Sequence, residues 1–301
     1  MRPGVLIWNP ASGGGRRYGG RIAEIRSLLA AGGFDVALQP TTEPEHATVL
    51  AAEACRLGGC EVVFGLGGDG TLRELAVALV GSQVPLAILP GGTTNVLAMA
   101  LGVPAHPLRA AALYGAAASE RELDVGLAGG IPFLMMVTVG VDAEILRRAS
   151  QRSKRRFGRF AVAAQALAAM RAYGTPTHTL AAEGRRVAGS FVAVSNIRYY
   201  GGPFEITPRA DPLDGRLDFA VFTGRGALAT LELALDVLTG THLARSDLVV
   251  WQGATARLEG DGEVWLQIDG DPMRLALPIE IGLAPERLRV LLPASLADDA
   301  V

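Results

Sequence analysis

The sequence predicts an α/β domain followed by a β-rich domain that folds as a sandwich. In the first 121 residues, short apolar runs typical of buried strands alternate with amphipathic segments typical of helices. Three of these runs are each followed by a glycine-rich loop and a helix. From residue 122 onward, short strands separated by turns such as Asp-Gly dominate. We therefore expect two domains, 1–121 and 122–301, and leave open that the last residues pack back on the first.

The first glycine loop lies close to the start of the chain. Val5–Trp8 is a short apolar run typical of a buried strand, and Asn9-Pro10-Ala11-Ser12-Gly13 follows it. We expect an amphipathic helix from Arg16 to about Ala30. Glycines let backbone N–H groups approach an anion closely, and a helix start adds unsatisfied N–H donors. This loop is therefore suited to wrap a phosphate.

The second glycine loop, Gly67-Gly68-Asp69-Gly70, follows the apolar run Val62–Leu66. Thr71 and Glu74 have the spacing of a capping box, which predicts a helix capped by Thr71. The turn contains no lysine, and the chain has no G-x-x-x-x-G-K-[ST] sequence, so a Walker loop is excluded.

Asp69 is unusual inside a phosphate loop, because a carboxylate repels phosphate. The spelling Gly65-x-Gly67-x-x-Gly70 matches the dinucleotide fingerprint, but no acidic residue for the ribose follows about 20 residues later. Handling of a Mg²⁺-nucleotide, with Asp69 as metal partner or proton acceptor, explains the residue better than a Rossmann oxidoreductase does. The open alternative is that Asp69 only caps the next helix.

The third glycine loop, Pro90-Gly91-Gly92-Thr93-Thr94-Asn95, follows the strand that we expect at Pro85–Leu89. Alternating strands and helices imply a mainly parallel sheet. In such sheets, ligands bind beyond the carboxyl ends of the strands. We therefore expect all three loops to converge at one sheet edge and to bind a phosphate-bearing ligand there.

The second domain contains most of the predicted strands. We expect them at 122–127, 131–139, 177–183, 186–195, 217–223, 248–258, 264–268, 273–277 and 287–292. Two helices, at about 157–173 and 227–239, interrupt this pattern. Two domains leave a cleft, which is a usual place for a ligand.

The composition limits the class of protein. The net charge of −2 gives no overall field that attracts nucleic acid, so we expect no nucleic-acid partner. Cys55 and Cys60 have no ligand-spaced neighbours and indicate small thiols in a reducing cytosol. The start of the chain lacks a signal-peptide pattern, and we expect a cytoplasmic protein. The basic stretch Arg147–Arg159 is suited to peripheral contact with anionic lipid at the inner membrane surface; a solvated helix face is the alternative.

Together these motifs resemble the diacylglycerol kinase catalytic superfamily, which includes bacterial soluble lipid kinases and sphingosine kinases. Nearly the whole chain carries the resemblance, in the order of the family's motifs. The motifs are Asn9-Pro10-x-Ser12-Gly13-x-Gly15, Gly67-Gly68-Asp69-Gly70-Thr71-x-x-Glu74, Pro90-x-Gly92-Thr93-x-Asn95, Arg121-x-x-Asp124-Val125-Gly126, Val139-Gly140-Val141-Asp142-Ala143, Asn196 with Gly201-Gly202, Pro208-x-Ala210-x-x-x-Asp214-Gly215-x-Leu217-Asp218 and Ile268-Asp269-Gly270-Asp271.

The resemblance implies a Rossmann-like nucleotide domain of the NAD kinase and diacylglycerol kinase type, a β-sandwich domain, and ATP and Mg²⁺ as cofactors. By resemblance, ATP is held by Asn9, Pro10, Ala11, Ser12, Gly13, Thr41, Gly67, Gly68, Asp69, Gly70, Thr71, Glu74, Gly92, Thr93 and Asn95. The implied catalytic set is Asp69, Asp124 and Asp271, with Asp271 taking the proton from the acceptor hydroxyl. The implied structural Mg²⁺ loop is Asp214 with the backbone carbonyls of Asp211 and Arg216, for which a simple hairpin turn is the alternative.

Two positions depart from the family's pattern. Asp271 stands where the family usually has Glu, and Val96 stands where many members have Asp. Both changes bear on the rate and on the identity of the acceptor.

The resulting hypothesis is an ATP- and Mg²⁺-dependent lipid kinase that phosphorylates a diacylglycerol-like hydroxyl at a membrane surface. The alternatives are a soluble-substrate kinase of the NAD kinase type and a catalytically weak nucleotide-binding regulator. The oligomeric state stays open, with a homodimer among the alternatives.

Overall fold

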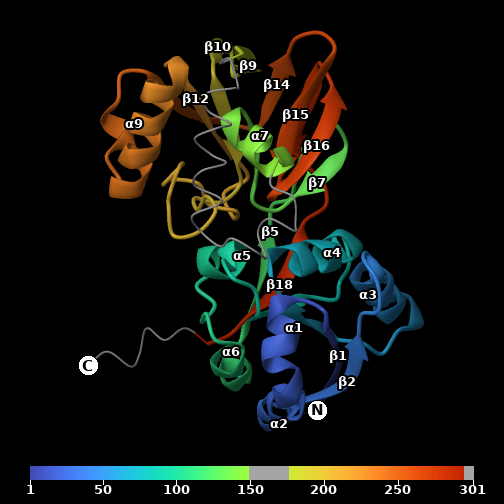
Figure 1. The fold of residues 1–301 in the computed structure, drawn as a ribbon. Coiled ribbons are helices and arrows are strands. Elements are labelled where there is room, and N and C mark those ends of the chain that lie inside the picture. Colours follow the sequence, from blue (N-terminus) through green and yellow to red (C-terminus); the bar gives the residue numbers. More distant parts are fainter. Residues whose placement is uncertain (149–175, 295–301) are drawn as a thin grey trace. The chain divides into compact units, whose positions relative to one another are not determined.

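A computed structural model of the protein describes residues 1–148 and 176–294 (Figure 1). The chain divides into two compact units. Unit 1 is Met1–Val125 together with the stretch that begins at Pro285, and unit 2 is Gly126–Ala284. The predicted helix at 157–173 lies outside the described residues.

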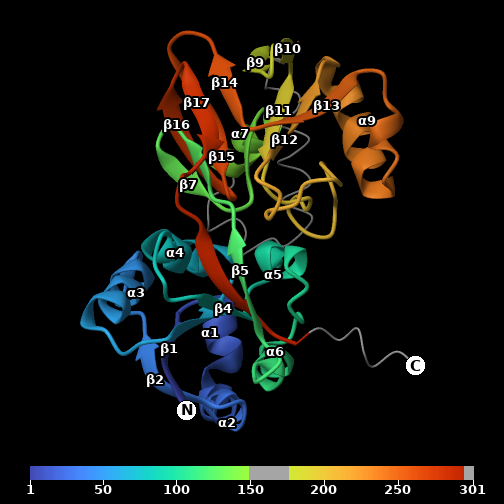
Figure 2. The ribbon, with the colours of Figure 1, turned by 180° about the vertical axis from the view of Figure 1, so that it is seen from behind.

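A six-stranded, mainly parallel sheet forms the centre of unit 1. Its strands are β1 (Arg2–Trp8), β2 (Phe34–Pro40), β3 (Val62–Gly67), β4 (Leu86–Pro90), β5 (Ser119–Leu123) and β18 (Leu288–Leu292). Their order is β2-β1-β3-β4-β18-β5, and only the β18–β5 pair is antiparallel. β3 and β4 are buried at every residue, which explains why both are continuous apolar runs in the sequence. Figure 2 shows β18 beside β5.

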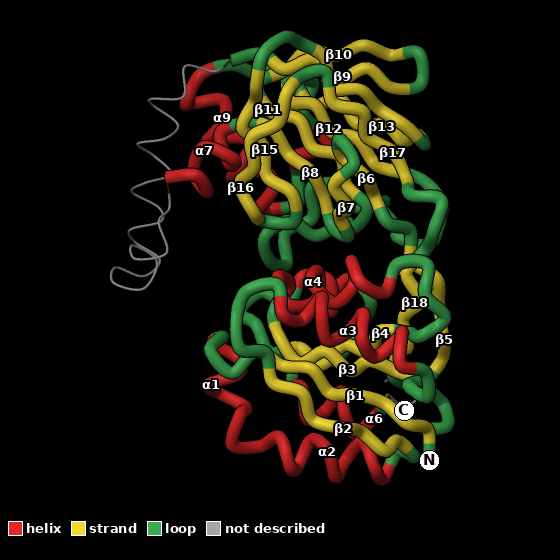
Figure 3. The backbone as a smooth tube through the Cα atoms, turned by 90° about the vertical axis from the view of Figure 1, so that its right-hand side faces the viewer, coloured by secondary structure: helices red, strands yellow, loops and turns green. Residues whose placement is uncertain are grey.

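Helices cover both faces of this sheet. They are α1 (Gly13–Tyr18), η1 (Gly19–Arg21), α2 (Ile22–Ala31), α3 (His46–Leu57), α4 (Asp69–Leu79), α5 (Val96–Ala100) and α6 (Pro107–Leu113). Helices α3 and α4 pack together on one face, and α2 and α6 pack together on the other (Figure 3). The α/β architecture predicted for this part of the chain is confirmed.

Two helix starts in unit 1 differ from the predictions. α1 begins at Gly13 and not at Arg16, because the Ser12 hydroxyl caps it by accepting from the Gly15 N–H at 2.8 Å. α4 begins at Asp69 with Gly68 as N-cap, so the predicted capping role of Thr71 is wrong. The Thr71 side chain packs over Gly67 instead.

Unit 2 is a sandwich of two six-stranded antiparallel sheets, as the sequence predicts. The first sheet has the order β10-β9-β14-β17-β6-β7, and the second has the order β13-β12-β11-β8-β15-β16. The strands are β6 (Gly126–Ala128), β7 (Ile131–Phe133), β8 (Met136–Val139), β9 (His178–Ala182), β10 (Arg185–Gly189), β11 (Phe191–Ser195), β12 (Leu217–Phe222), β13 (Leu248–Gly253), β14 (Thr255–Glu259), β15 (Glu263–Ile268), β16 (Asp271–Ala276) and β17 (Ile279–Leu283). Side chains of both sheets form one core between them.

Three long predicted strands each divide into a pair that serves both sheets. The chain passes from the first sheet to the second between β7 and β8, at residues 134–135, and between β10 and β11, at Ser190. It returns to the first sheet between β13 and β14, at Ala254. The sequence analysis missed β17, whose alternation is short and interrupted by Gly282.

The second sheet is covered on its outer face as well. Alternate residues of its strands, such as Phe191 and Phe222, point away from the sandwich core and pack against Leu233 of α9 (Gly226–Thr239). α7 (Val141–Arg148) follows β8, and η2 (His242–Ala244) follows α9. Within 1–148 and 176–294, the structure contains no helix that is both long and apolar enough to cross a bilayer.

Candidate functional site

The three glycine loops meet at the carboxyl ends of β1, β3 and β4. The Gly91 N–H donates to the Gly67 carbonyl at 2.7 Å. A Cβ atom on Gly14 would lie 1.9 Å from the Gly91 oxygen, and one on Gly92 would lie 2.5 Å from the Gly68 Cα. The loops therefore touch backbone to backbone, and only glycine permits this approach. The parallel sheet thus brings the first and third loops into contact, although almost 80 residues separate them in the sequence.

Asn9 and Ser12 shape the first loop through their side chains. The Asn9 Oδ1 accepts from the N–H groups of Ala11 and Ser12 at 2.9 and 3.1 Å. The Ser12 hydroxyl donates to the Asn9 carbonyl at 2.7 Å. Thr41 lies next to this loop, since its N–H donates to the Trp8 carbonyl at 2.8 Å. These contacts fix the turn and leave the first turn of α1, with its N–H groups, at the same sheet edge.

Asn95 closes the third loop. Its backbone is left-handed, with φ of 51°, and its side chain both accepts from the Gly92 N–H at 2.7 Å and donates to the Gly92 carbonyl at 3.1 Å. Thr93 and Thr94 are exposed at the tip of this loop. Asn95 therefore acts on the shape of the loop, while Thr93 is available to a ligand.

Asp69 links the second loop to the third. Its Oδ1 accepts from the Leu97 N–H at 3.1 Å, and its Oδ2 accepts from the Thr94 hydroxyl at 3.0 Å. The carboxylate thus caps α5, and not α4, which was the helix considered for it in the sequence. A carboxylate oxygen can accept more than one interaction, so these contacts also leave capacity for a metal ion. Glu74 lies one turn further along α4, where its carbonyl accepts from the Thr48 hydroxyl at 2.9 Å.

The structure does not bring Asp124 together with Asp69 inside unit 1. Asp124 follows β5, whose Leu123 pairs with Leu288 at the start of β18. Because β18 runs parallel to β4, this position is at the sheet edge opposite the glycine loops. Asp124 is only 3% exposed and forms an ion pair with Arg287, with an Oδ1–Nη2 distance of 3.0 Å. The pair joins the ends of β5 and β18, which is a structural contribution.

In unit 2, Asp271 is the exposed first residue of β16, directly after the β15–β16 turn. The turn residues Asp269 and Gly270 have φ values of 50° and 89°, which is the geometry of a two-residue hairpin. The buried Asp269 carboxylate accepts from three consecutive N–H groups, those of residues 134, 135 and 136, at 2.8, 2.9 and 3.0 Å. Asp269 therefore anchors the turn that presents Asp271. The sequence analysis treated this dipeptide as a turn within a family motif and missed the anchor.

The predicted Mg²⁺ loop precedes β12. The Asp211 and Asp214 carboxylates accept from the N–H groups of Leu213 and Arg216, at 3.0 and 2.9 Å. Two carboxylates and the neighbouring carbonyls form an oxygen-only donor set, which is the chemistry that Mg²⁺ prefers. Arg216 has only its carbonyl to offer a cation. In the described part of the chain, no group of three or more His, Cys, Asp and Glu side chains has the arrangement of a metal site.

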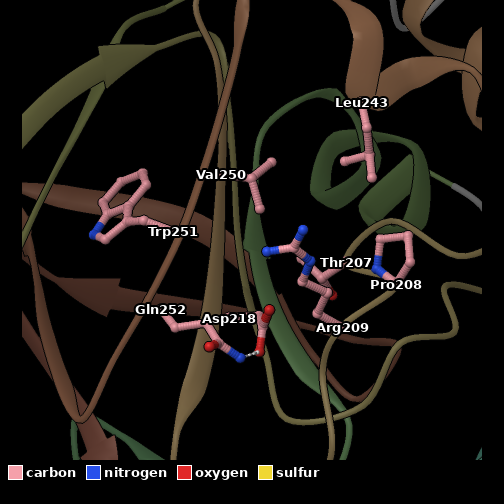
Figure 4. Close-up of a pocket in the computed structure, with 8 residues that line it drawn as sticks. All are labelled: Thr207, Pro208, Arg209, Asp218, Leu243, Val250, Trp251 and Gln252. Atoms are coloured by element: carbon pink, nitrogen blue, oxygen red, sulfur yellow. Dashed lines mark hydrogen bonds between the residues drawn. The ribbon is translucent and has the colours of Figure 1, made fainter.

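A cavity of about 320 Å³ with both polar and apolar lining residues lies beside the strand that follows this loop (Figure 4). Asp218 of β12 accepts from the Gln252 amide at 2.9 Å, and burial raises the pKa of its carboxyl group. Figure 4 shows Arg209 and Thr207 on one side of this pair and Trp251 turned away from it.

A second cavity of about 230 Å³, under α9, is almost entirely apolar. Its lining consists of Val141, Asp142, Phe191, Tyr200, Phe204, Ile206, Thr230, Leu233, Ala234, Val237 and Leu238. Asp142 is the one ionisable carboxyl group among these residues; it accepts from the Tyr200 hydroxyl at 2.9 Å and from the Thr138 hydroxyl. Burial raises the pKa of Asp142, and burial together with Asp142 raises the pKa of Tyr200. A long apolar chain with one polar end fits such a cavity.

Comparison with known proteins agrees with both units. Residues 3–128 match the family model "Diacylglycerol kinase catalytic domain", and residues 135–292 match "YegS C-terminal NAD kinase beta sandwich-like domain". The chain belongs to the diacylglycerol kinase catalytic family. Family relatives include "Probable lipid kinase YegS-like" of Pseudomonas aeruginosa, 32% identical over 279 residues and covering 90% of both chains.

A "Diacylglycerol kinase" of Mycobacterium tuberculosis is 29% identical over 297 residues, covering 96% of this chain and 94% of its own. A crystal structure from Bacillus anthracis, described as a candidate diacylglycerol kinase, matches with a TM-score of 0.79 and 25% identity, covering 97% of this chain and 95% of its own. The two-domain fold of the diacylglycerol kinase family is therefore the fold of this chain, and it is a kinase by family.

Proposed function

We propose that this member of the diacylglycerol kinase family transfers the γ-phosphate of ATP to the hydroxyl group of a diacylglycerol-like lipid at a membrane surface. The observation that supports a lipid acceptor is the apolar cavity under α9, which combines hydrocarbon walls with one buried carboxyl group. A nicotinamide dinucleotide carries phosphates and hydroxyl groups along its length, and burying them against these walls is costly.

The glycine loops of unit 1 support the nucleotide half of the proposal. Backbone N–H groups of the three loops bind the phosphates, and Thr93 and Asp69 lie at the same edge. Asp69 holds the third loop against the second, so that both loops keep one geometry around the triphosphate. In such transfers, positioning and electrostatics supply most of the catalysis.

Asp271 acts as the proton acceptor for the lipid hydroxyl, and Asp269 positions it through the anchored turn. Asp211 and Asp214 hold Mg²⁺, with backbone carbonyls completing the oxygen set. An ion bound there would stabilise the conformation of the loop that holds it. Thr41, Asn9 and Ser12 shape the pocket around the nucleotide.

The cavity offers a direct test. Ala234 lines the apolar cavity but is exposed on α9, so Ala234→Trp narrows the cavity mouth without overpacking the core. We expect the KM for a long-chain diacylglycerol to rise about tenfold or more, because loss of apolar contact weakens acceptor binding. The KM for ATP should stay unchanged. The matched control is Val49→Trp, at an exposed position of α3 in unit 1. An unchanged KM for the lipid in Ala234→Trp would show that the cavity is not part of the acceptor site.

A further inference from the structure

Helix α9 is apolar on two opposite faces. One face, which includes Leu233 and Val237, packs against the outer surface of the second sheet. The opposite face carries four leucines spaced by three, four and three residues, so that they form one line along the helix. This leucine stripe consists of Leu228, Leu231, Leu235 and Leu238, which are 71%, 43%, 53% and 53% exposed.

A surface helix is usually apolar on one face and polar on the opposite face, so two opposite apolar faces indicate that both are covered in the working protein. Exposed apolar side chains are also concentrated in this part of the chain. Of the thirteen exposed large apolar side chains that the structure describes, five lie between Leu228 and Leu243. Scattered exposed leucines need no explanation, whereas a contiguous patch marks an interaction surface.

The carboxylates next to the stripe are both paired with the same arginine. Glu232 and Asp236 lie on the flank of α9, and Arg245 approaches their carboxylates at 3.7 and 2.6 Å. Arg245 also forms an ion pair with Asp247 at 2.7 Å, and its side chain is only 16% exposed. The carboxylates beside the stripe are thus paired with a mostly buried cation, which lowers the cost of placing this flank near an apolar phase.

The stripe is continuous with the apolar cavity. Leu238 belongs to the stripe and also lines the cavity, and Phe204, another lining residue, is 37% exposed. A single apolar surface therefore runs from the outside of α9 to the inside of the cavity. An apolar chain can follow this surface without crossing water.

We infer that the leucine stripe of α9 inserts into the boundary between headgroups and acyl chains of a lipid bilayer, where it delivers the acceptor lipid to the cavity. This inference rests on the proposed lipid kinase function. It places membrane contact on α9, in addition to the basic stretch Arg147–Arg159, most of which lies outside the described residues. Because the inserting side chains are leucines, the binding is apolar and depends little on salt.

A second copy of the chain is the other occupant that the leucine spacing fits. The four leucines together expose only the area of about two whole leucine side chains, far less than the roughly 800 Å² per partner of a standard protein interface. A bilayer has no such minimum, since insertion strength grows with each buried side chain. The observations therefore favour the bilayer.

The test uses the full chain and phosphatidylcholine vesicles that contain diacylglycerol. One variant carries Leu228→Gln, Leu231→Gln and Leu235→Gln, and it spares Leu238 because that residue lines the cavity. The matched control carries Val49→Gln, Leu57→Gln and Val77→Gln, at positions that are 51%, 71% and 41% exposed in unit 1. We expect vesicle flotation of the stripe variant to fall about tenfold or more, at low and high salt alike. The control should float like wild type.

Three other results would overturn the inference. The first is equal flotation of the stripe variant and wild type. The second is a wild-type dimer, measured by light scattering, that becomes a monomer in the stripe variant, which assigns the stripe to a second copy. The third is a loss of folding stability in the stripe variant without vesicles, which assigns it to a segment of this chain.

A kinase assay separates this inference from the proposed function. With a short-chain diacylglycerol dissolved as monomers, the stripe variant should keep wild-type activity, and with vesicles it should lose activity in proportion to binding. Vesicle binding by a wild-type protein that phosphorylates no lipid would refute the proposed function and keep the docking surface. Normal activity of the stripe variant on vesicles would refute the docking surface and keep the proposed function.

Discussion

Asp69 is the residue at which a positioning role and a catalytic role can be separated by two substitutions. In the folded protein its two oxygens accept from the Leu97 N–H at 3.1 Å and from the Thr94 hydroxyl at 3.0 Å. Asp69→Asn keeps an oxygen for Leu97 and offers an amide donor to Thr94, whose hydroxyl can accept. The loop geometry is therefore kept while the negative charge is lost. Asp69→Ala removes both the charge and the two hydrogen bonds.

The magnitudes follow from these contacts. Asp69→Asn replaces charge-assisted hydrogen bonds by neutral ones, a loss of about 1 kcal/mol of folding free energy after allowance for the half-exposed site. Asp69→Ala leaves the Leu97 N–H without this acceptor, a loss of roughly 1–3 kcal/mol. If the charge takes part in phosphate transfer, both variants lose about 100-fold or more in kcat, by analogy with the loss of one preorganised electrostatic group.

The assay is label transfer from γ-labelled ATP to lipid, combined with urea denaturation of each variant. The account predicts that Asp69→Asn is nearly as inactive as Asp69→Ala while being distinctly more stable. Near-normal turnover in Asp69→Asn, with a low value in Asp69→Ala, would refute the reasoning. Asp69 would then act only as a clamp between the second and third glycine loops.

Two further predictions concern unit 2. Asp269→Ala leaves three backbone N–H groups without their acceptor and should lower the free energy of unfolding by on the order of 3 kcal/mol. Asp269→Asn should lower it by less. A denaturation midpoint of the alanine variant equal to that of wild type would contradict this role. Burial raises the folded-state pKa of Asp142 above its ordinary value of 3.8. The folded protein therefore favours the protonated carboxyl group, and this contribution to stability is lost as pH rises from about 4 through the raised pKa. Asp142→Asn removes this loss, so urea denaturation should show the variant gaining stability relative to wild type between acidic and neutral pH; a constant difference across that range would contradict the shift.

Much of the nucleotide half could be predicted because its signals are local. Glycines followed by a helix start identify each loop, and the strand–helix alternation implies a parallel sheet that brings the loops to one edge. The helix starts were harder to predict, because Thr71 has the spelling of a cap while its side chain packs over Gly67.

The proposed acceptor site could not be predicted, since its signals are not local. The cavity under α9 is lined by residues such as Phe191, Leu233 and Val237, whose residue types occur in any apolar core. The contact between Asp142 and Tyr200 joins residues 58 positions apart. The Asp124–Arg287 ion pair likewise joins two distant strand ends, so the sequence could suggest a catalytic carboxylate where the structure shows a buried ion pair.

The most direct measurement of the central claim is the destination of the labelled phosphate. The protein is incubated with γ-labelled ATP, Mg²⁺, a total lipid extract in mixed micelles and NAD, and the label is then partitioned between organic and aqueous phases. The account predicts label in the organic phase on a new lipid, which is absent with Asp69→Asn. Label transferred only to a water-soluble product would contradict the account and indicate a kinase of the NAD kinase type.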